Sequence, residues 1–295
     1  MTARHGPPEP ARVALVGAGS VGTAAALLLR RAGHVVAGVA SRTRATATRA
    51  SALLEVPVFD PPATLVHTAD VVLLGVPGAV LTEVTKDLAP ALRPGTVVVH
   101  FAGAVGLTPL SPALASGVSG CALHPVAACP DVVSALRRLP GSAWGVTCAD
   151  DLRPWAHDFV RAGLAGVPVD VAEEDRPVWH AAAVTTANGV TALVAAAEAM
   201  LDAIGVADPA AVLGPLAAGA VANARESGAG ATLTGPAVRG ETETIARHLR
   251  ALEGIDPLLA DDYRVAARAI VTGARRAGRL DAAAEDRMSA VLGTR

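Results

Sequence analysis

Near its N-terminus the chain reads Arg12-Val-Ala-Leu-Val-Gly-Ala-Gly-Ser-Val-Gly22, an apolar run followed by glycines in the spacing G-x-G-x-x-G. The apolar run predicts a buried parallel strand, and the Ala- and Leu-rich segment 23–32 predicts a helix after it. Gly33 and His34 end that helix, and the apolar segment 35–40 predicts a second strand. A strand, a glycine turn, a helix and a second strand within about 30 residues are typical of a dinucleotide-binding unit.

The glycines of the turn have distinct physical roles in such a unit. Gly17 permits the tight turn, Gly19 lets the backbone approach a pyrophosphate, and Gly22 lets the helix pack closely on the strand. The free N–H groups at the start of the helix attract phosphate. We therefore expect the turn to bind the pyrophosphate of a dinucleotide through Gly17, Ala18, Gly19, Ser20, Val21 and Gly22.

The residues after the second strand indicate which dinucleotide binds. NAD sites usually carry Asp or Glu there for the ribose 2′-hydroxyl, whereas NADP sites supply Arg for the 2′-phosphate. This chain has Ser41, Arg42 and Thr43 at these positions, and its next acidic residue is Glu55. The sequence therefore favours NADPH, although an arginine in such a loop can also be simply solvated.

The composition limits the classes of protein to consider. The chain has 295 residues, of which 52% are apolar and only 2% aromatic, so Ala, Val and Leu must form most of the core. The net charge of −2 gives no general attraction to nucleic acid or to an anionic membrane. Three cysteines without C-x-x-C spacing indicate neither a disulfide framework nor a metal site.

Two further segments bear on where the protein acts. The most apolar stretch, 181–200, is interrupted by Thr, Asn and Glu, which favours a buried helix over a membrane span. The first ten residues are polar and proline-rich and do not resemble a signal peptide. We therefore expect a soluble cytoplasmic protein.

Alternating strands and helices continue as far as about residue 171. Further strands are predicted at 56–59, 70–77, 95–100, 121–125, 143–148 and 167–171, with helices at 45–54, 79–89 and 152–165. Val76 and Pro77 end one of these strands at the edge of the sheet where ligands bind, so both should flank the cofactor.

From residue 175 onward the sequence predicts helices alone, at 178–204, 208–227, 240–252, 256–277 and 281–292. We therefore expect an α/β fold in three parts. Residues 1–10 form a disordered lead-in, and residues 11–172 form a doubly wound, mostly parallel Rossmann sheet. Residues 173–295 form an all-helical domain for substrate binding and dimerisation, in which the long apolar helix supplies a dimer interface or a monomeric core.

Histidines are the main candidates for acid–base chemistry, because the one lysine lies in a predicted surface helix and the one tyrosine lacks the Tyr-x-x-x-Lys spacing. His100 and His124 each end a predicted strand on the ligand side of the sheet. His180 lies near the start of the long helix, with Asn188 eight residues later on roughly the same face. We predict that His124, His180 and Asn188 are catalytic and that His100 and Gly103 contact substrate. The alternative for each histidine is a partly buried ring bonded to backbone.

The segment 230–240 is rich in Gly, Thr and Pro and lies between two predicted helices. Arg239 could bind a substrate carboxylate through its two-pronged guanidinium. Thr232 or Thr234 could form a hydrogen bond with a carbonyl or hydroxyl group. The alternative is that these residues only mark helix ends and that the arginine is solvated.

Together these motifs resemble the Rossmann-like reductases of the DUF2520 family, within the 6-phosphogluconate dehydrogenase-like superfamily. The resemblance covers nearly the whole chain and implies NADP-linked reduction. Its relatives by fold include pyrroline-5-carboxylate reductase, ketopantoate reductase and deazaflavin (F420)-dependent NADP reductase. The motifs that carry it are Gly17-Ala-Gly-Ser-Val-Gly22, His100-Phe-Ala-Gly103, Leu123-His-Pro125, His180-Ala-Ala-Ala183 with Asn188, and Leu233-Thr-Gly-Pro-Ala-Val-Arg-Gly240.

The sequence departs from its relatives in two places. Val126-Ala-Ala-Cys-Pro130 replaces a more hydrophobic and aromatic run after His-Pro. β-Hydroxyacid dehydrogenases and the common ketopantoate reductases place a lysine four residues before the asparagine, where this chain has Val184. The lysine mechanism therefore does not carry over, and His180 or His124 would have to replace that lysine.

The sequence thus predicts an NADPH-dependent oxidoreductase that reduces an imine or a small 2-oxo acid, similar to an alternative ketopantoate reductase. It predicts a homodimer without metal, nucleic-acid or membrane partners. Three alternatives remain open at this point. They are a non-catalytic NADP(H)-binding sensor or accessory protein, a scaffold whose helical domain dimerises, and a deazaflavin-linked NADP reductase.

Overall fold

The structure is a computed structural model and describes residues 10–293. It divides into two compact units, with the boundary between Val184 and Thr185. This boundary lies beyond the predicted one at residue 172, because helix α8 (Arg176–Val184) is bonded to the first unit through Arg176 and Trp179. The predicted lead-in, apart from its last residue, lies outside the described residues.

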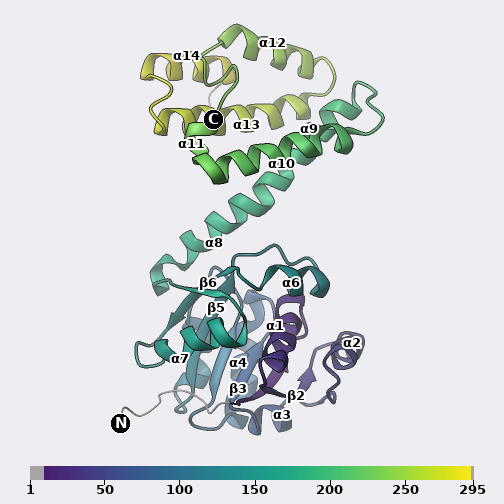
Figure 1. Ribbon diagram of the computed structural model, residues 1–295, viewed down its shortest axis with the longest axis vertical. Helices are drawn as coiled ribbons and strands as arrows, with labels where there is room; N and C mark the ends of the chain where they lie inside the picture. Colours follow the sequence, from purple (N-terminus) through teal and green to yellow (C-terminus); the bar gives the residue numbers. More distant parts are fainter. Residues whose placement is uncertain (1–9, 294–295) are drawn as a thin grey trace. The chain divides into compact units, whose positions relative to one another are not determined.

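The described part of the first unit contains one seven-stranded sheet of order β2-β1-β3-β4-β5-β6-β7 (Figure 1). Neighbouring strands are parallel except for the antiparallel pair β5 and β6. The predicted doubly wound, mostly parallel sheet is confirmed, while the expected strand at 56–59 forms only an isolated bridge between Val39 and Val58. The strands are β1 (Arg12–Val16), β2 (Val35–Ala40), β3 (Val71–Leu74), β4 (Val97–His100), β5 (Ser119–Pro125), β6 (Ala143–Cys148) and β7 (Val167–Asp170).

Helices pack on both faces of this sheet. One face is covered by α1 (Ser20–Arg31), α2 (Arg44–Leu54), α6 (Val132–Arg138) and α7 (Arg153–Asp158). The other is covered by α3 (Ala63–His67), α4 (Leu81–Leu88) and α5 (Ser111–Leu114). Successive side chains of a strand alternate between the two cores, so that Leu73 packs in the first and Leu74 in the second. Burial on both faces explains why these strands are continuous apolar runs.

The direction of the strands brings several loops together at one edge of the sheet. Strands β1, β3, β4 and β5 are mutually parallel, so their carboxyl ends meet at that edge. The glycine turn follows β1, Gly75 follows β3, the loop 101–107 follows β4, and His124 lies near the end of β5. In open parallel sheets this edge is where ligands bind.

Every regular element described from Thr185 onward is helical. Helices α12, α13 and α14 form the core of this second unit around Ile245, Leu249, Val271 and Met288. Aspartates cap α10, α13 and α14 by accepting backbone hydrogen bonds, as expected for helix starts. The helices are α9 (Val190–Asp202), α10 (Pro209–Ser227), α11 (Ala229–Thr232), α12 (Thr242–Glu253), α13 (Pro257–Arg276) and α14 (Ala282–Leu292).

The long helical segment from Glu173 to Asp202 is not a regular α-helix throughout. Its backbone is π-helical over Thr185–Gly189, between α8 and α9. A π-helical turn bonds each residue to the fifth along the chain instead of the fourth. The regular α-helical spacing used to place Asn188 on the face of His180 therefore does not hold over the whole segment, and a shared face for the two residues stays a prediction.

The same segment is also not buried in the single chain, contrary to the prediction from its composition. Among the described helices it alone is long and apolar enough to span a membrane by length and composition, with a mean hydropathy of 1.3. Neither α9 nor α10 contains a buried residue, because α12–α14 form the core without them. Leu193 is 43% exposed and Leu216 is 69% exposed. The start of the segment is nevertheless held by protein, since Arg176 and Trp179 bond to the sheet.

Candidate functional site

The glycine turn is locked against the end of β3. Gly17 has φ +84°, and a β-carbon there would lie 2.3 Å from Cγ1 of Val76. A β-carbon on Gly75 would lie 2.1 Å from the carbonyl oxygen of Gly17, and one on Gly22 would lie 3.0 Å from Cα of Gly75. The close approach of the two segments therefore needs glycine on both sides. The sequence predicted roles for Gly17 and Gly22 and placed Gly75 at a strand end near the cofactor, but it did not indicate this contact between them.

Helix α1 begins in a way that suits an anion. Its N-cap residue Gly19 has extended backbone and offers no side-chain cap, and its first turn contains no acidic residue. The first N–H groups of a helix have no partner within the helix, and they carry its positive dipole end. The hydroxyl of Ser20 is used elsewhere, because it donates to the carbonyl oxygen of Cys129 at 2.8 Å. The turn residues therefore fit a pyrophosphate bound by backbone.

The loop after β2 fits a 2′-phosphate. Arg42 is exposed there, and no acidic side chain occurs between Ser41 and Leu54. The Thr43 side chain is used to cap α2, where it accepts a hydrogen bond from the backbone N–H of Thr46 at 3.4 Å. Arg42 is thus the member of the predicted trio that is best placed to bind a phosphate.

His100 holds the loop that follows β4. Its side chain is fully buried, and its Nδ1 accepts a hydrogen bond from the backbone N–H of Ala102 at 3.2 Å. Its Nε2 lies 2.7 Å from the carbonyl oxygen of Gly106. Burial lowers the pKa of His100 to about 4, so the ring is neutral at pH 7. Both nitrogens are therefore used within the loop, which matches the alternative of a histidine bonded to backbone.

Three predicted site residues do come together at the end of β5. The rings of His124 and His180 meet edge to face, with centroids 5.4 Å apart. A β-carbon on Gly103 would lie 2.2 Å from Cδ2 of His180 and 2.8 Å from Nε2 of His124. The absence of a side chain at Gly103 is therefore what lets the loop lie against both rings.

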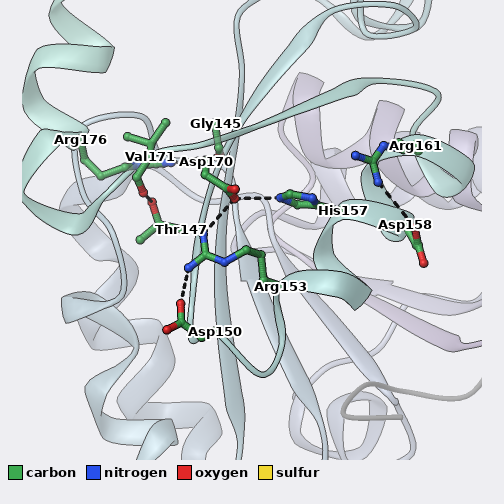
Figure 2. Close-up of polar contacts among 10 residues, drawn as sticks. All are labelled: Gly145, Thr147, Asp150, Arg153, His157, Asp158, Arg161, Asp170, Val171 and Arg176. Atoms are coloured by element: carbon green, nitrogen blue, oxygen red, sulfur yellow. Dashed lines mark hydrogen bonds and ion pairs between the residues drawn. The ribbon is translucent and has the colours of Figure 1, made fainter. Parts of the chain in front are cut away.

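Two residues of α8 that the sequence analysis missed support this cluster. Trp179 donates a hydrogen bond from its indole Nε1 to Nδ1 of His124 at 3.0 Å. Arg176 is fully buried and donates to the carbonyl oxygens of Gly145, at 3.1 Å, and Ala102, at 2.6 Å. Figure 2 shows Arg176 and Gly145 among the polar contacts near β6 and β7. The sequence feature that could have identified them is an arginine and a tryptophan shortly before His180 in an otherwise apolar helix.

Burial sets the charge state of this cluster. Burial, with smaller contributions from the positive charge of Arg176 and from His180, lowers the pKa of His124 to about 4. It also lowers the pKa of Arg176 to about 10, which still leaves the guanidinium charged at pH 7. Nε of Arg176 has no hydrogen-bond partner among the described residues. The cluster therefore combines a neutral histidine with one buried positive charge.

The glycine turn and the histidine cluster belong to one continuous row of loops. Val76 packs against Gly17, and a β-carbon on Gly78 would lie 3.4 Å from Cβ of Ala102, in ordinary contact. Ala102 in turn is bonded to Arg176 and precedes Gly103. A ligand bound at the glycine turn therefore lies along the same sheet edge as His124.

The remaining predicted residues lie in the second unit. Asn188 is exposed within the π-helical turn. Thr232 donates to the carbonyl oxygens of Gly228 and Ala229 at 3.2 and 3.1 Å, and Thr234 is exposed. Arg239 forms an ion pair with Glu241 at 2.6 Å. Their substrate contacts stay predictions. In residues 10–293, no group of three or more His, Cys, Asp or Glu side chains could hold a metal ion.

Models of two domain families match the chain in succession. A Rossmann-like domain matches residues 5–125, and a domain of unknown function (DUF2520) matches residues 142–270. The chain carries a Rossmann-like domain followed by a DUF2520 domain. This confirms the resemblance inferred from the motifs. No curated protein matches this chain.

Solved structures share the fold of this chain. A proposed NADP oxidoreductase from Bacteroides fragilis is 21% identical, with a TM-score of 0.74, and the match covers 89% of this chain and 98% of the other. An imine reductase from Myxococcus stipitatus, solved with NADP+, is 18% identical with a TM-score of 0.62, covering 94% and 99%. A pyrroline-5-carboxylate reductase from Coxiella burnetii is 18% identical with a TM-score of 0.58, covering 97% and 100%. At these identities the comparison establishes the shared fold.

Proposed function

We propose that this DUF2520 protein is an NADPH-dependent reductase of a small 2-oxo acid or imine. The observation that supports it most is the row of loops at the carboxyl edge of the sheet. One end of this row is a glycine turn suited to a pyrophosphate, and the other is the cluster of His124, His180 and Gly103. The structural neighbours that are NADP-linked reductases support the same class of reaction.

The residues of the first unit have separate tasks in this proposal. Gly17 to Gly22 bind the pyrophosphate, while Ser41, Arg42 and Thr43 surround the 2′-phosphate, with Arg42 as the charged partner. Val76 and Pro77 flank the dinucleotide where β3 ends. When bound, NADPH supplies the hydride. His124 and His180 orient the C=O or C=N group and help to deliver the proton that reduction requires.

The second unit supplies candidates for the rest of the substrate. Asn188 is a further catalytic candidate, and Arg239 with Thr232 or Thr234 would hold a carboxylate or another polar end of the substrate. Arg239 would have to exchange its ion pair with Glu241 for such a carboxylate. His100 acts on the site through the loop that contains Gly103.

We also propose that the protein is a homodimer assembled through its helical unit. Helices α9 and α10 expose apolar side chains that include Leu193, Val212 and Leu216. Several large apolar side chains exposed on neighbouring helices are consistent with an interface with protein. Sedimentation equilibrium would show a dimer, and a monomer at micromolar concentration would contradict this part of the proposal.

A substrate panel tests the reductase proposal. Purified protein is mixed with NADPH and with 2-oxo acids or cyclic imines, and oxidation is followed by NADPH absorbance. We expect turnover with at least one compound and a loss of about 100-fold or more in His124→Ala. His180→Ala should also lower turnover. Binding of NADPH without oxidation by any compound would instead favour a non-catalytic NADP(H)-binding protein.

A further inference from the structure

The hydrogen bond between Trp179 and His124 determines where the histidine carries its proton. The indole N–H of tryptophan can only donate a hydrogen bond. It points at Nδ1 of His124 over 3.0 Å, so Nδ1 must offer a lone pair. The proton of the neutral imidazole is then on Nε2.

The indole is held in place by the neighbouring strand. Gly145 in β6 is the register partner of His124 in β5, and a β-carbon on Gly145 would lie 2.7 Å from Cε2 of Trp179. The absence of a side chain at Gly145 therefore lets the indole approach the strand closely beside His124. Arg176, three residues before Trp179 on α8, donates to the carbonyl oxygen of the same Gly145. One strand residue thus fixes both α8 side chains.

The opposite edge of the imidazole faces the loop after β4. Nε2 of His124 lies beside Gly103, 2.8 Å from the place where a β-carbon would stand. The charged and titratable groups that act on this ring are Arg176 and His180, both from α8. Protonation of Nδ1 would make two N–H groups, those of the imidazole and the indole, point at each other. It would also place a second positive charge near Arg176. Both effects oppose the imidazolium form.

We propose that Trp179 is a positioning residue that keeps His124 in the Nε2–H tautomer, so that His124 acts as a neutral hydrogen-bond donor. Its partner would be the oxygen or nitrogen atom of the substrate group that is reduced. This inference rests on the proposed reductase function. It assigns polarisation of that atom to His124, and transfer of the proton then falls to His180 or to water.

Nuclear magnetic resonance of 15N-labelled histidine tests the tautomer without any substrate. Long-range correlations between ring hydrogens and nitrogens distinguish a protonated from an unprotonated nitrogen, and His124→Asn identifies the signals. At pH 7 we expect Nε2 protonated and Nδ1 unprotonated in the wild-type protein. In Trp179→Phe the two nitrogens should move toward the averaged shifts of exchanging tautomers. Wild-type His124 with a proton on Nδ1 would overturn the inference, as would an unchanged tautomer in Trp179→Phe.

Kinetics then measure the consequence for the reaction. Trp179→Phe should lower kcat roughly fivefold to tenfold, as expected for the loss of one hydrogen bond, and leave the KM for NADPH unchanged. Trp155→Phe is the matched control, because Trp155 stacks on Phe159, and it should change neither the tautomer nor kcat. Equal loss in both variants would reduce Trp179 to a packing role. If no compound is reduced although the tautomer is as expected, the proposed function fails and the assignment of the proton to Nε2 stands.

Discussion

Cδ2 of His180 lies 2.2 Å from the point where a β-carbon on Gly103 would stand. Side-chain atoms cannot approach so closely, so any residue larger than glycine must displace the imidazole or the loop. A side chain at position 103 would also displace His124, because Nε2 of His124 lies 2.8 Å from that point. The geometry of both histidines thus depends on the absence of one side chain.

Gly103→Ala is therefore expected to lower turnover at least tenfold, because small displacements of catalytic groups reduce rates strongly. NADPH binding should change little, since the cofactor residues lie at the other end of the row of loops. Turnover and NADPH affinity measured on the same preparation test this. Gly254→Ala is the matched control, because its β-carbon would make only ordinary contacts at 3.5 Å. Full activity in Gly103→Ala would show that the histidine pair does not need its present geometry.

Arg42→Ala is expected to weaken NADPH binding about tenfold and to leave NADH binding unchanged. The reason is that a guanidinium forms charge-assisted hydrogen bonds with a phosphate that NADH lacks. Isothermal titration calorimetry with both dinucleotides measures the difference. Arg49→Ala is the matched control, since Arg49 instead donates to Thr46 within helix α2. A similar loss for both dinucleotides would contradict a role for Arg42 at the 2′-phosphate.

Arg176→Met is expected to lower the free energy of unfolding by about 2 kcal/mol, because it leaves one buried and one partly buried carbonyl oxygen without the guanidinium donor. Those acceptors belong to Gly145 and Ala102, in two different segments of the first unit. Denaturant unfolding measures the change. Arg161→Met is the control and should have a much smaller effect, since surface ion pairs such as Arg161–Asp158 contribute little (Figure 2). Equal stability of both variants would show that the buried guanidinium does not hold the loop.

The buried His100 predicts how stability depends on pH. Its pKa is lowered to about 4 in the folded protein by burial, against 6.5 in the unfolded chain, while Gly106 and Glu173 act in the opposite direction to Arg176. Between these values the unfolded state binds the proton and the folded state does not. The free energy of unfolding is therefore unaffected by this histidine above pH 6.5, and it falls by roughly 3 kcal/mol as the pH is lowered from 6.5 toward 4.

Unfolding free energies measured from pH 7.5 down to pH 4.5 test this dependence. In His100→Gln the slope of unfolding free energy against pH between pH 6.5 and 4.5 should be clearly smaller than in the wild-type protein. If His100→Gln leaves the slope unchanged, other groups are responsible for the loss of stability in acid.

Local sequence patterns predicted the first β-α-β unit well. The strands Arg12–Val16 and Val35–Ala40 have the predicted bounds, because a glycine turn and an alanine-rich helix are specified by neighbouring residues. The cluster of His124, His180 and Gly103 was also within reach, because the ends of parallel strands meet at one edge. These features need only the order of the elements along the chain.

Other features depend on contacts between distant segments and could not be predicted in this way. In the sequence, Arg176 and Trp179 are simply two residues of a mostly apolar helix. Their roles depend on the position of α8 beside β6, where the carbonyl oxygen of Gly145 accepts a hydrogen bond from Arg176 and the missing side chain of Gly145 leaves room for Trp179. The π-helical turn at Thr185–Gly189 has no marker in the composition of that helix. His100 also looked like a ligand-facing residue, because its burial depends on the fold of the following loop.

The most direct test of the central claim is NADPH oxidation by wild-type protein and by His124→Ala over one panel of 2-oxo acids and cyclic imines. We predict that at least one compound is reduced by the wild-type protein and that the variant is about 100-fold slower while still binding NADPH. Equal rates in the two proteins, or bound NADPH that no compound oxidises, would contradict the account.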